Sequence, residues 1–288
     1  MTTSPSLSSH DVEQRVRDAV AFIRARSAGA PRAGITLGSG LGGAVQSLSD
    51  ATVIPTGEIP HWPRSTVAGH AGKLALGGWG GVPVVALAGR SHRYEGYSLD
   101  RVTFAVRVMH ALGARSLIFT NAVGAIHPEL RPRDLVLASS HINFIGRRGL
   151  LSPRELEARG RARPVAQPYD PGLAAELVAA ARAARVTLRR GILMGGLGPT
   201  YETASEVRMA AAFGADVACM STVHEVELGA ALGAACASIS CVTNRATGLA
   251  GHPLTHEEVT EIADEAASKI RAILDAYFAA RPAEFTAA

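Results

Sequence analysis

Short apolar runs and amphipathic segments alternate along most of this chain, and this alternation restricts the fold more than any other feature. A short apolar run between turn residues favours a buried strand, whereas apolar residues three or four positions apart favour a helix. Strands are predicted at residues 34–37, 82–88, 116–120, 134–139, 189–194 and 235–243. Helices are predicted at residues 12–25, 99–112, 169–184, 204–213 and 256–279, with a further helix holding Glu225 and Glu227. This order predicts an α/β fold with helices on both faces of a sheet.

The 288 residues contain no repeat, linker or change of composition, so one domain is predicted over residues 10–288. Residues 1–9 are rich in Ser and Thr and are predicted to be a flexible tail without the pattern of a secretory signal. The apolar run Leu228–Val242 is too short and too polar to cross a bilayer. The three cysteines lack CxxC spacing and are expected to be buried free thiols. A reducing, cytoplasmic location without a membrane partner is therefore predicted.

The net charge of +4 is concentrated in residues 145–168. That segment contains two glutamates and six arginines, namely Arg147, Arg148, Arg154, Arg159, Arg161 and Arg163. It has no interleaved aromatic residues and no recognition-helix pattern. A solvated basic loop is therefore predicted, and nucleic acid is not expected as a partner.

Polar residues follow four of the predicted strands at the point where each strand ends. They are Ser39, the pair Arg90 and His92, Asn121, and the pair Thr243 and Asn244. Ligands of α/β sheets bind beyond the carboxyl ends of the strands. These side chains are therefore expected to share one pocket.

The glycine-rich segment 38–43 (GSGLGG) directly follows a predicted strand. Such a turn can point backbone N–H groups at an anion, and the Ser39 hydroxyl adds a donor. The segment also fits the dinucleotide fingerprint GxGxxG, but a full helix and a second strand ending at an acid do not follow it. Phosphate binding is favoured over dinucleotide binding and over a purely structural turn.

Segment 89–97 (GRSHRYEGY) places several functional side chains directly after a strand. The Arg90 guanidinium matches phosphate oxygens, and His92 can exchange a proton with phosphate near neutral pH. Tyr94 can pack on a sugar and hydrogen-bond it. A solvated polar turn is the alternative.

Three further segments permit both a functional and a structural interpretation. In residues 198–203 (GPTYET), Tyr201 and Glu202 suit a heterocycle, but the segment can also cap the following helix. Ser221 precedes a helix whose N-terminus attracts anions, or it is a simple cap. Asn244 carries a donor and an acceptor that can recognise a purine edge. His256 either lines the pocket or opens the last helix. A metal site at His252 and His256 is disfavoured by Pro253 and by the lack of a third ligand.

Taken in order, these segments resemble the trimeric purine nucleoside phosphorylase family, which includes methylthioadenosine phosphorylase. The resemblance covers about residues 35–280 and rests on the segments GSGLGG (38–43), GRSHRYEGYS (89–98), TNAVGA (120–125), HIN (141–143), GPTYET (198–203), MSTVHE (220–225) and TN…HEEV (243–259). It implies a single-domain phosphorylase-type fold with a central mixed β-sheet flanked by helices on both faces.

The resemblance also implies the roles of individual residues. Phosphate would be bound by Ser39, Arg90, His92, Ser221 and the backbone N–H of Ala122. The ribose would be lined by Tyr94, Met220 and His256. The base would meet Tyr201, Glu202 and Asn244, with Glu202 at N1–H and Asn244 at N7 and O6. Asn244, Glu202 and His92 would be the catalytic residues.

These roles imply a pentosyltransferase of purine salvage that cleaves 6-oxopurine ribo- or deoxyribonucleosides such as inosine and guanosine. The products would be the free base and α-(deoxy)ribose 1-phosphate, with inorganic phosphate as co-substrate, no metal or other cofactor, and a homotrimeric assembly. The Glu202/Asn244 pair favours this reading over methylthioadenosine phosphorylase. A catalytically inactive nucleoside-binding protein is the other alternative.

Some positions depart from the family pattern. Val123 and Ala125 stand where small residues are common, and their side chains are expected to tighten the pocket floor. Ser140 stands where Asp is frequent, and Cys219 where Gly is frequent. Arg147 or Arg148 occupies the place of a Phe that in some members reaches into a neighbouring subunit, although Phe144 lies close by.

Overall fold

The structure is a computed structural model that describes residues 9–38, 41–67, 72–146, 151, 166–249 and 256–281. The side chains of residue 9 and of residues 256–261, 263 and 264 are outside this description.

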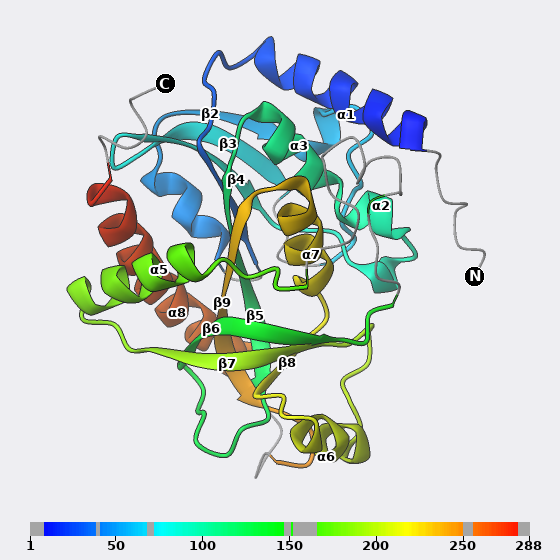
Figure 1. Cartoon of the computed structure of the whole chain (residues 1–288), viewed down its shortest axis with the longest axis vertical. Coiled ribbons are helices and arrows are strands. Elements are labelled where there is room, and N and C mark those ends of the chain that lie inside the picture. The colour runs from blue at the N-terminus through cyan, green and yellow to red at the C-terminus, as the bar shows by residue number, and fades with distance from the viewer. Residues whose placement is uncertain are drawn as a thin grey trace.

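A mixed β-sheet forms the centre of the molecule (Figure 1). Its strands are β1 (Ala33–Leu37), β2 (Ser49–Pro55), β3 (Lys73–Trp79), β4 (Val82–Ala88), β5 (Ser116–Ala125), β6 (Leu135–Asn143), β7 (Leu188–Gly195), β8 (Val217–Cys219) and β9 (Ala235–Arg245). Within the described ranges, nine strands are ordered β2-β3-β4-β1-β5-β8-β7-β6-β9. Because β9 also pairs with β5 in parallel, strands β5, β8, β7, β6 and β9 form a closed circuit. The predicted mixed sheet is confirmed, and its partial closure is an addition.

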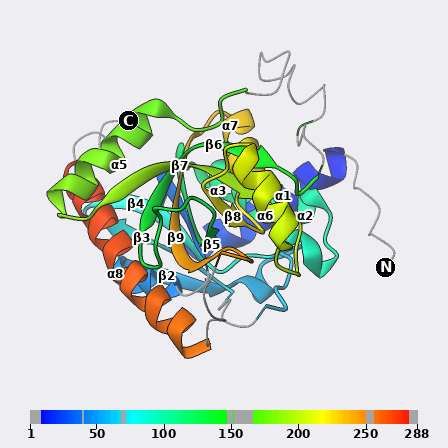
Figure 2. The ribbon, with the colours of Figure 1, turned by 90° about the horizontal axis from the view of Figure 1, so that it is seen from below.

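Helices cover both faces of the sheet, as predicted (Figures 1 and 2). They are α1 (Ser9–Arg24), α2 (Leu99–Val102), α3 (Phe104–Leu112), α5 (Pro171–Ala183), α6 (Ala204–Ala212), α7 (Val223–Leu232) and α8 (His256–Ala279). Helix α3 contacts both α1 and α7, whereas α5 contacts α8. None of the helices in the described ranges combines the length and the apolar character that a bilayer span requires.

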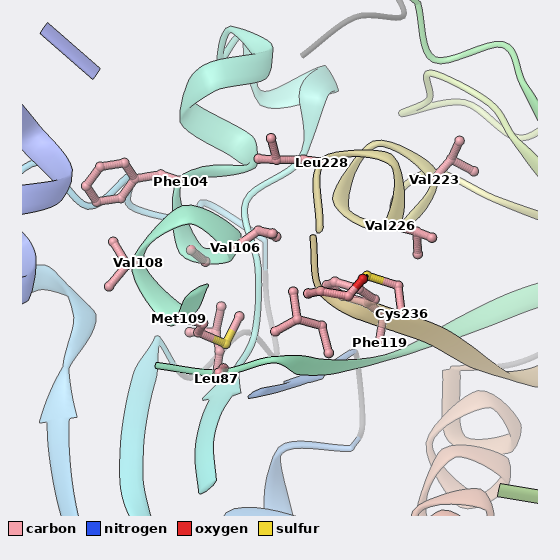
Figure 3. Close-up of a cluster of buried hydrophobic side chains, with 14 of the residues drawn as sticks. Leu87, Phe104, Val106, Val108, Met109, Phe119, Val223, Val226, Leu228 and Cys236 are labelled. Atoms are coloured by element: carbon pink, nitrogen blue, oxygen red, sulfur yellow. The ribbon is translucent and has the colours of Figure 1, made fainter. Parts of the chain in front are cut away.

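Alternation along β5 separates the two larger hydrophobic cores of the described residues. Phe119 belongs to the core under α3 and α7, which Figure 3 shows together with Met109 and Val226. Its neighbour Ile118 belongs to the core under α5 and α8. Successive strand side chains point to opposite faces, so one strand supplies both cores.

Helix α7 is enclosed by the protein: nine of its ten residues are buried, including His224 and Glu225. A Cβ on Gly229 would lie 2.6 Å from the Cys236 sulfur, so glycine lets α7 pack directly on β9. The enclosed helix supports the part of the site that contains Glu225.

The structure differs from the sequence predictions at several elements. The helix expected at residues 99–112 is divided into α2 and α3 at Thr103, whose hydroxyl donates to the Leu99 carbonyl at 2.7 Å. Such bonding to the carbonyl four residues earlier competes with regular helix geometry. Strands β2, β3 and β8 were not predicted, and β5 extends to Ala125 rather than ending before Asn121. Most of the 145–168 segment and residues 1–8 of the predicted tail lie outside the described residues, and Ser9, the last residue of that predicted tail, begins α1.

Strand β2 stands at one end of the strand order and pairs with β3. Its register shifts between Ser49 and Thr52, Asp50 has a φ of 50°, and Pro55 ends the strand. Only Ile54 among its residues is buried.

Candidate active site

A cavity of about 820 Å³, a volume that includes space open to solvent, lies beside the ends of β4, β5, β8 and β9. It is lined by Arg90, His92, Tyr94, Asn121, Ala122, Val123, Gly124, Tyr201, Glu202, Ala218, Cys219, Met220, Ser221, Thr243, Asn244, Ala246 and Thr247. Nine of the residues to which the resemblance assigns a role are therefore gathered in one place, together with Asn121 and Thr243, which were also expected in this pocket. Ser39 lies outside the described residues. His256 opens α8, as expected, but its side chain is not described.

Arg90 follows β4 and is held at two points. Its Nη1 donates to the Thr120 carbonyl at 3.0 Å, and its Nη2 lies 3.1 Å from Oε2 of Glu225 in α7. Both side chains are almost completely buried. Burial raises the pKa of Glu225, and the Arg90 guanidinium opposes that rise. The pair fixes a cation at the floor of the cavity.

Gly38 allows the end of the β1 segment to approach this floor closely. A Cβ at that position would lie 2.6 Å from the Thr120 carbonyl oxygen and 2.9 Å from the Asn121 Cα. A side chain at residue 38 would therefore collide with the backbone of β5.

His92 is oriented by Glu95, three residues later. The Glu95 Oε1 accepts from the His92 backbone N–H at 2.5 Å and lies 3.3 Å from the ring Nδ1. Its Oε2 accepts from the backbone N–H of Thr66 at 2.6 Å and from the Thr66 hydroxyl at 2.9 Å. Burial alone would raise the pKa of Glu95, but these hydrogen bonds lower it below its ordinary value. The carboxylate thus holds the Nδ1 edge of the imidazole and links residues 65–66 to it.

Ser221 enters the cavity from a strained turn at the start of α7. Thr222 has φ 69° and ψ −49°, and the Val223 N–H donates to the Ser221 carbonyl at 2.7 Å. This three-residue γ-turn is rare for a β-branched residue and is costly. Strain of this kind persists where the surrounding structure fixes it, and it is concentrated at functional sites.

Asn244 belongs to β9 and lies beside Gly124 of β5, four residues along that strand from Thr120, whose carbonyl accepts from Arg90. Its Oδ1 accepts from the Thr243 hydroxyl at 2.9 Å, and its Nδ2 donates to the Arg245 carbonyl at 3.0 Å. These contacts set the direction of the amide. Its partly exposed side chain remains beside the cavity.

The segment carrying Tyr201 and Glu202 packs, through Gly198, against Met220 and Tyr94 of the cavity lining. A Cβ on Gly198, which has φ +70°, would lie 2.5 Å from the Met220 sulfur and 2.9 Å from Cδ1 of Tyr94. The Tyr94 ring also stacks on His92, with ring centroids 4.8 Å apart. Tyr201 is 74% exposed at the cavity mouth. The side chains of Met220, Tyr94 and His92 therefore form one continuous wall of the cavity.

The structure locates several residues at which the sequence departs from the family pattern. Val123 is buried and lines the cavity, whereas Ala125 is buried but is not among the residues that line it, so its expected place in the pocket floor is not found. All three cysteines are buried free thiols, as expected. Burial raises the pKa of Cys219 to about 11, so it is a neutral lining residue. Phe144 is exposed, and residues 147–148 lie outside the described ranges.

Sequence reasoning missed the groups that hold the lining residues. Glu95 could have been found, because a carboxylate three residues after an N-cap is a capping-box signal, and the structure has that box at His92–Glu95. Thr243 was noticed at the end of a strand but not as the partner of Asn244. Glu225 left no signal, because its contact with Arg90 joins distant parts of the chain.

The chain is similar to known proteins over most of its length. The family described as the phosphorylase superfamily matches residues 32–279. Purine nucleoside phosphorylase 1 of Bacillus subtilis is 38% identical over 254 residues, covering 88% of this chain and 94% of the relative. Purine nucleoside phosphorylase 1 of Geobacillus stearothermophilus is 40% identical, covering 87% and 91%. A crystal structure of isoform 2 of the Schistosoma mansoni purine nucleoside phosphorylase, with cytosine and ribose-1-phosphate, has a TM-score of 0.82 at 31% identity, covering 94% of this chain and 97% of that one.

Proposed function

The chain belongs to the phosphorylase superfamily, and from this premise we propose that it cleaves 6-oxopurine nucleosides with inorganic phosphate. Its relatives in bacteria and animals are purine nucleoside phosphorylases, which are pentosyltransferases. The proposed substrates are inosine, guanosine and their deoxy forms. One observation carries the proposal: Glu202 and Asn244 share a cavity with the buried cation Arg90.

Phosphate occupies the end of the cavity at Arg90, His92 and Ser221 in this proposal, with the Ala122 N–H as a further donor. The buried guanidinium supplies a fixed positive charge, and a positioned imidazole supplies a hydrogen bond. The start of α7 adds the favourable end of a helix dipole beside Ser221. Ser39 is assigned to the same group on the resemblance alone.

The pentose lies between the two ends, against Tyr94 and Met220. Gly198 packs closely against both residues, so a sugar would meet side chains that are already held in place. His256 is assigned to this part of the site on the resemblance alone. Near-attack positioning of the pentose over phosphate is a large part of the rate enhancement that such a site supplies.

The purine meets Tyr201, Glu202 and Asn244 at the open end. Glu202 accepts from N1–H, which a 6-oxopurine carries and a 6-aminopurine lacks. Asn244 donates to N7 and shares the edge with O6. This donor acts where negative charge develops on the leaving base, so its bond strengthens in the transition state.

The reaction breaks the bond between C1′ and N9, and its electron pair leaves with the purine. A phosphate oxygen forms the new bond to C1′ from the opposite side, which gives α-ribose 1-phosphate from a β-nucleoside. Phosphate also places negative charge near the positive charge that develops on the sugar. The base is protonated as it departs, with Asn244 sharing the proton at N7.

We further propose that phosphate is the only co-substrate, that no metal or other cofactor takes part, and that the chain works as a cytoplasmic homotrimer in purine salvage. The chain's own donors account for each contact invoked above. Activity should survive exhaustive chelation, and light scattering should give three times the mass of one chain.

The test is release of hypoxanthine from inosine by the purified protein, with and without phosphate. Phosphate-dependent release with formation of ribose 1-phosphate supports the proposal. Release without phosphate would instead indicate a hydrolase. Preference for 5′-methylthioadenosine over inosine would indicate the related methylthioadenosine activity, and no release from either would indicate a binding protein.

A further inference from the structure

The segment 141–143 (HIN) has no role in the reaction proposed above, yet two of its side chains form a polar cluster with helix α7. Asn143 Nδ2 donates to both carboxylate oxygens of Glu227, at 3.2 and 3.3 Å. His141 Nε2 lies 3.2 Å from Oε1 of the same carboxylate. The side chains of His141 and Glu227 are largely buried. One carboxylate on α7 therefore holds the carboxyl end of β6 at two points.

Tyr169 completes the cluster from the segment before α5. Its hydroxyl lies 3.2 Å from His141 Nδ1, and the two rings meet edge to face with centroids 5.6 Å apart. Because a carboxylate only accepts hydrogen bonds, the Nε2 of His141 carries the proton that faces Glu227. Burial raises the pKa of Tyr169 well above its ordinary value, so the phenol keeps its proton and can donate to Nδ1. One tautomer of His141 thus satisfies both neighbours, and a satisfied buried network makes its surroundings rigid.

The cluster reaches the base end of the cavity through β7. Asn143 and Gly195 are register partners on β6 and β7, and the N–H of Phe144 donates to the Gly195 carbonyl at 2.8 Å. The Asn143 Oδ1 also accepts from the N–H of Ile145 at 3.0 Å. A Cβ on Gly195 would lie 3.0 Å from Cδ1 of Ile145 and 2.8 Å from Cγ2 of Val223. The end of β7 is therefore enclosed between the two elements that the cluster joins, β6 and α7.

The chain continues from this enclosed point directly to Glu202. The N–H of Gly196 donates to the Cys219 carbonyl at 2.8 Å. A Cβ on Gly196 would lie 3.0 Å from Oε1 of Glu202. The Glu202 carboxylate therefore lies against the backbone that directly follows β7, and a shift of the β7 end would move it.

We propose that Glu227 is a positioning residue for the base-binding segment. Through His141 and Asn143 it fixes the end of β6 relative to α7, and this fixes the path of residues 195–202. Glu202 is then presented to the purine in one orientation. Such control matters because a displacement of about 1 Å, caused by a substitution far from the chemistry, can cost about a hundredfold in rate. This inference rests on the proposed role of Glu202 in binding the base.

The experiment compares wild type with Glu227→Leu, Glu227→Gln and the control Leu228→Ala. Leucine removes both acceptor oxygens of the carboxylate, whereas glutamine keeps one. Leu228 is the next residue of α7, is fully buried and has no polar side-chain atom that could bond the cluster. Its truncation leaves a cavity under the same helix. The control therefore separates loss of the cluster from a general loss of stability.

Steady-state kinetics with each substrate varied should show a selective effect. Glu227→Leu should raise the KM for inosine about tenfold, the value of one hydrogen bond to a charged group. The KM for phosphate should change by less than about threefold. Glu227→Gln should restore most of the affinity for inosine. Asn143→Leu should resemble Glu227→Leu, and combining the two should add little, because both remove the same connection.

Amide hydrogen exchange followed by mass spectrometry gives a readout that does not depend on activity. Peptides from residues 193–202 should exchange about tenfold faster in Glu227→Leu, because the end of β7 opens more often. Peptides from α3 should be unchanged in that variant. Leu228→Ala should show the reverse pattern, because Leu228 belongs to the core that α3 and α7 share.

Unchanged exchange of residues 193–202 in folded Glu227→Leu would overturn the proposal. An equal rise in the KM for inosine in Leu228→Ala would also overturn it, because stability alone would then account for the effect. If wild type cleaves no nucleoside, the proposed function fails, and faster exchange confined to residues 193–202 in Glu227→Leu would still support the positioning role. If wild type cleaves inosine with phosphate and this exchange is unchanged, the proposed function stands and the role of Glu227 fails.

Discussion

The two ends of the cavity are built differently. At one end, Arg90 and His92 are buried, and each is held by a carboxylate, Glu225 or Glu95. At the other end, Tyr201 is 74% exposed, and Glu202 and Asn244 are only partly buried. The contrast suggests that the anion end is preorganised at a cost in stability, whereas the base end can change with little effect on the fold. Substitutions at the two ends should therefore separate loss of stability from loss of activity.

The largest effect is expected at Arg90. Arg90→Met should reduce kcat/KM by about a thousandfold and lower the free energy of unfolding by about 3–5 kcal/mol, because it leaves the Glu225 carboxylate buried without its cation. Adding Glu225→Leu should recover most of the stability and none of the activity. Urea unfolding and steady-state kinetics measure both. A double variant as unstable as Arg90→Met would show that the ion pair is not the source of the loss.

Asn244→Ala comes next and should act on turnover alone. Its kcat for inosine should fall by about a hundredfold to a thousandfold, because the donor to the leaving base is removed. The KM for phosphate and the free energy of unfolding should stay close to wild type, because Asn244 is partly exposed and far from the buried ion pair. Normal turnover in this variant would remove Asn244 from the mechanism.

Glu202→Gln should reduce kcat/KM for inosine by about tenfold to a hundredfold, the value of a hydrogen bond to a charged acceptor. The protein should remain folded with an unchanged unfolding midpoint. Relative activity toward adenosine should rise, because the amide can donate where the carboxylate only accepts. Undiminished cleavage of inosine would mean that another group recognises the base.

Glu95→Gln should have a smaller effect that is confined to phosphate. The amide keeps one oxygen but loses the charge that holds His92 and Thr66, so the KM for phosphate should rise about tenfold. Glu206→Gln is the matched control, because Glu206 completes the capping box of α6 with Thr203 and contacts no cavity histidine. An equal rise in the KM for phosphate in both variants would show that Glu95 acts only as a helix cap.

The smallest effect concerns acid and the buried His224 of α7. Burial lowers the pKa of His224 from 6.5 to about 3. Between these values the unfolded chain binds a proton that the folded chain does not, so stability falls as the pH drops below 6.5 and this loss ends near pH 3. The loss from this residue should reach about 1 kcal/mol one pH unit below the unfolded pKa. His224→Leu should remove this component from the pH profile of urea unfolding. An unchanged profile would assign the acid sensitivity to other groups.

The elements that sequence predicted well are those with a strong local pattern. The apolar run of β4 and the long amphipathic α8 match their predicted bounds. Strand β3 contains Gly77 and Gly78, so it shows little apolar pattern, and its pairing with β4 defines it. The break at Thr103 depends on a hydroxyl that a periodicity argument does not consider.

The cavity followed from a topological rule, because polar residues at the ends of several strands must meet. The groups that hold them did not follow. Glu225 reaches Arg90 only because α7 packs into the sheet. Contacts of this kind depend on distances between elements, which local sequence does not contain.

The closure of β5, β8, β7, β6 and β9 also bears on how the protein behaves at high concentration. Exposed strand edges can recruit strands from other molecules and so begin aggregation. Within the described ranges, a circuit of paired strands leaves little edge on that side, and β2 is the edge at the other end of the order. Its register shift, its Asp50 at positive φ and its terminal Pro55 are features that interrupt such pairing. The same sheet that assembles the cavity thus offers few places where a second sheet could be extended from it.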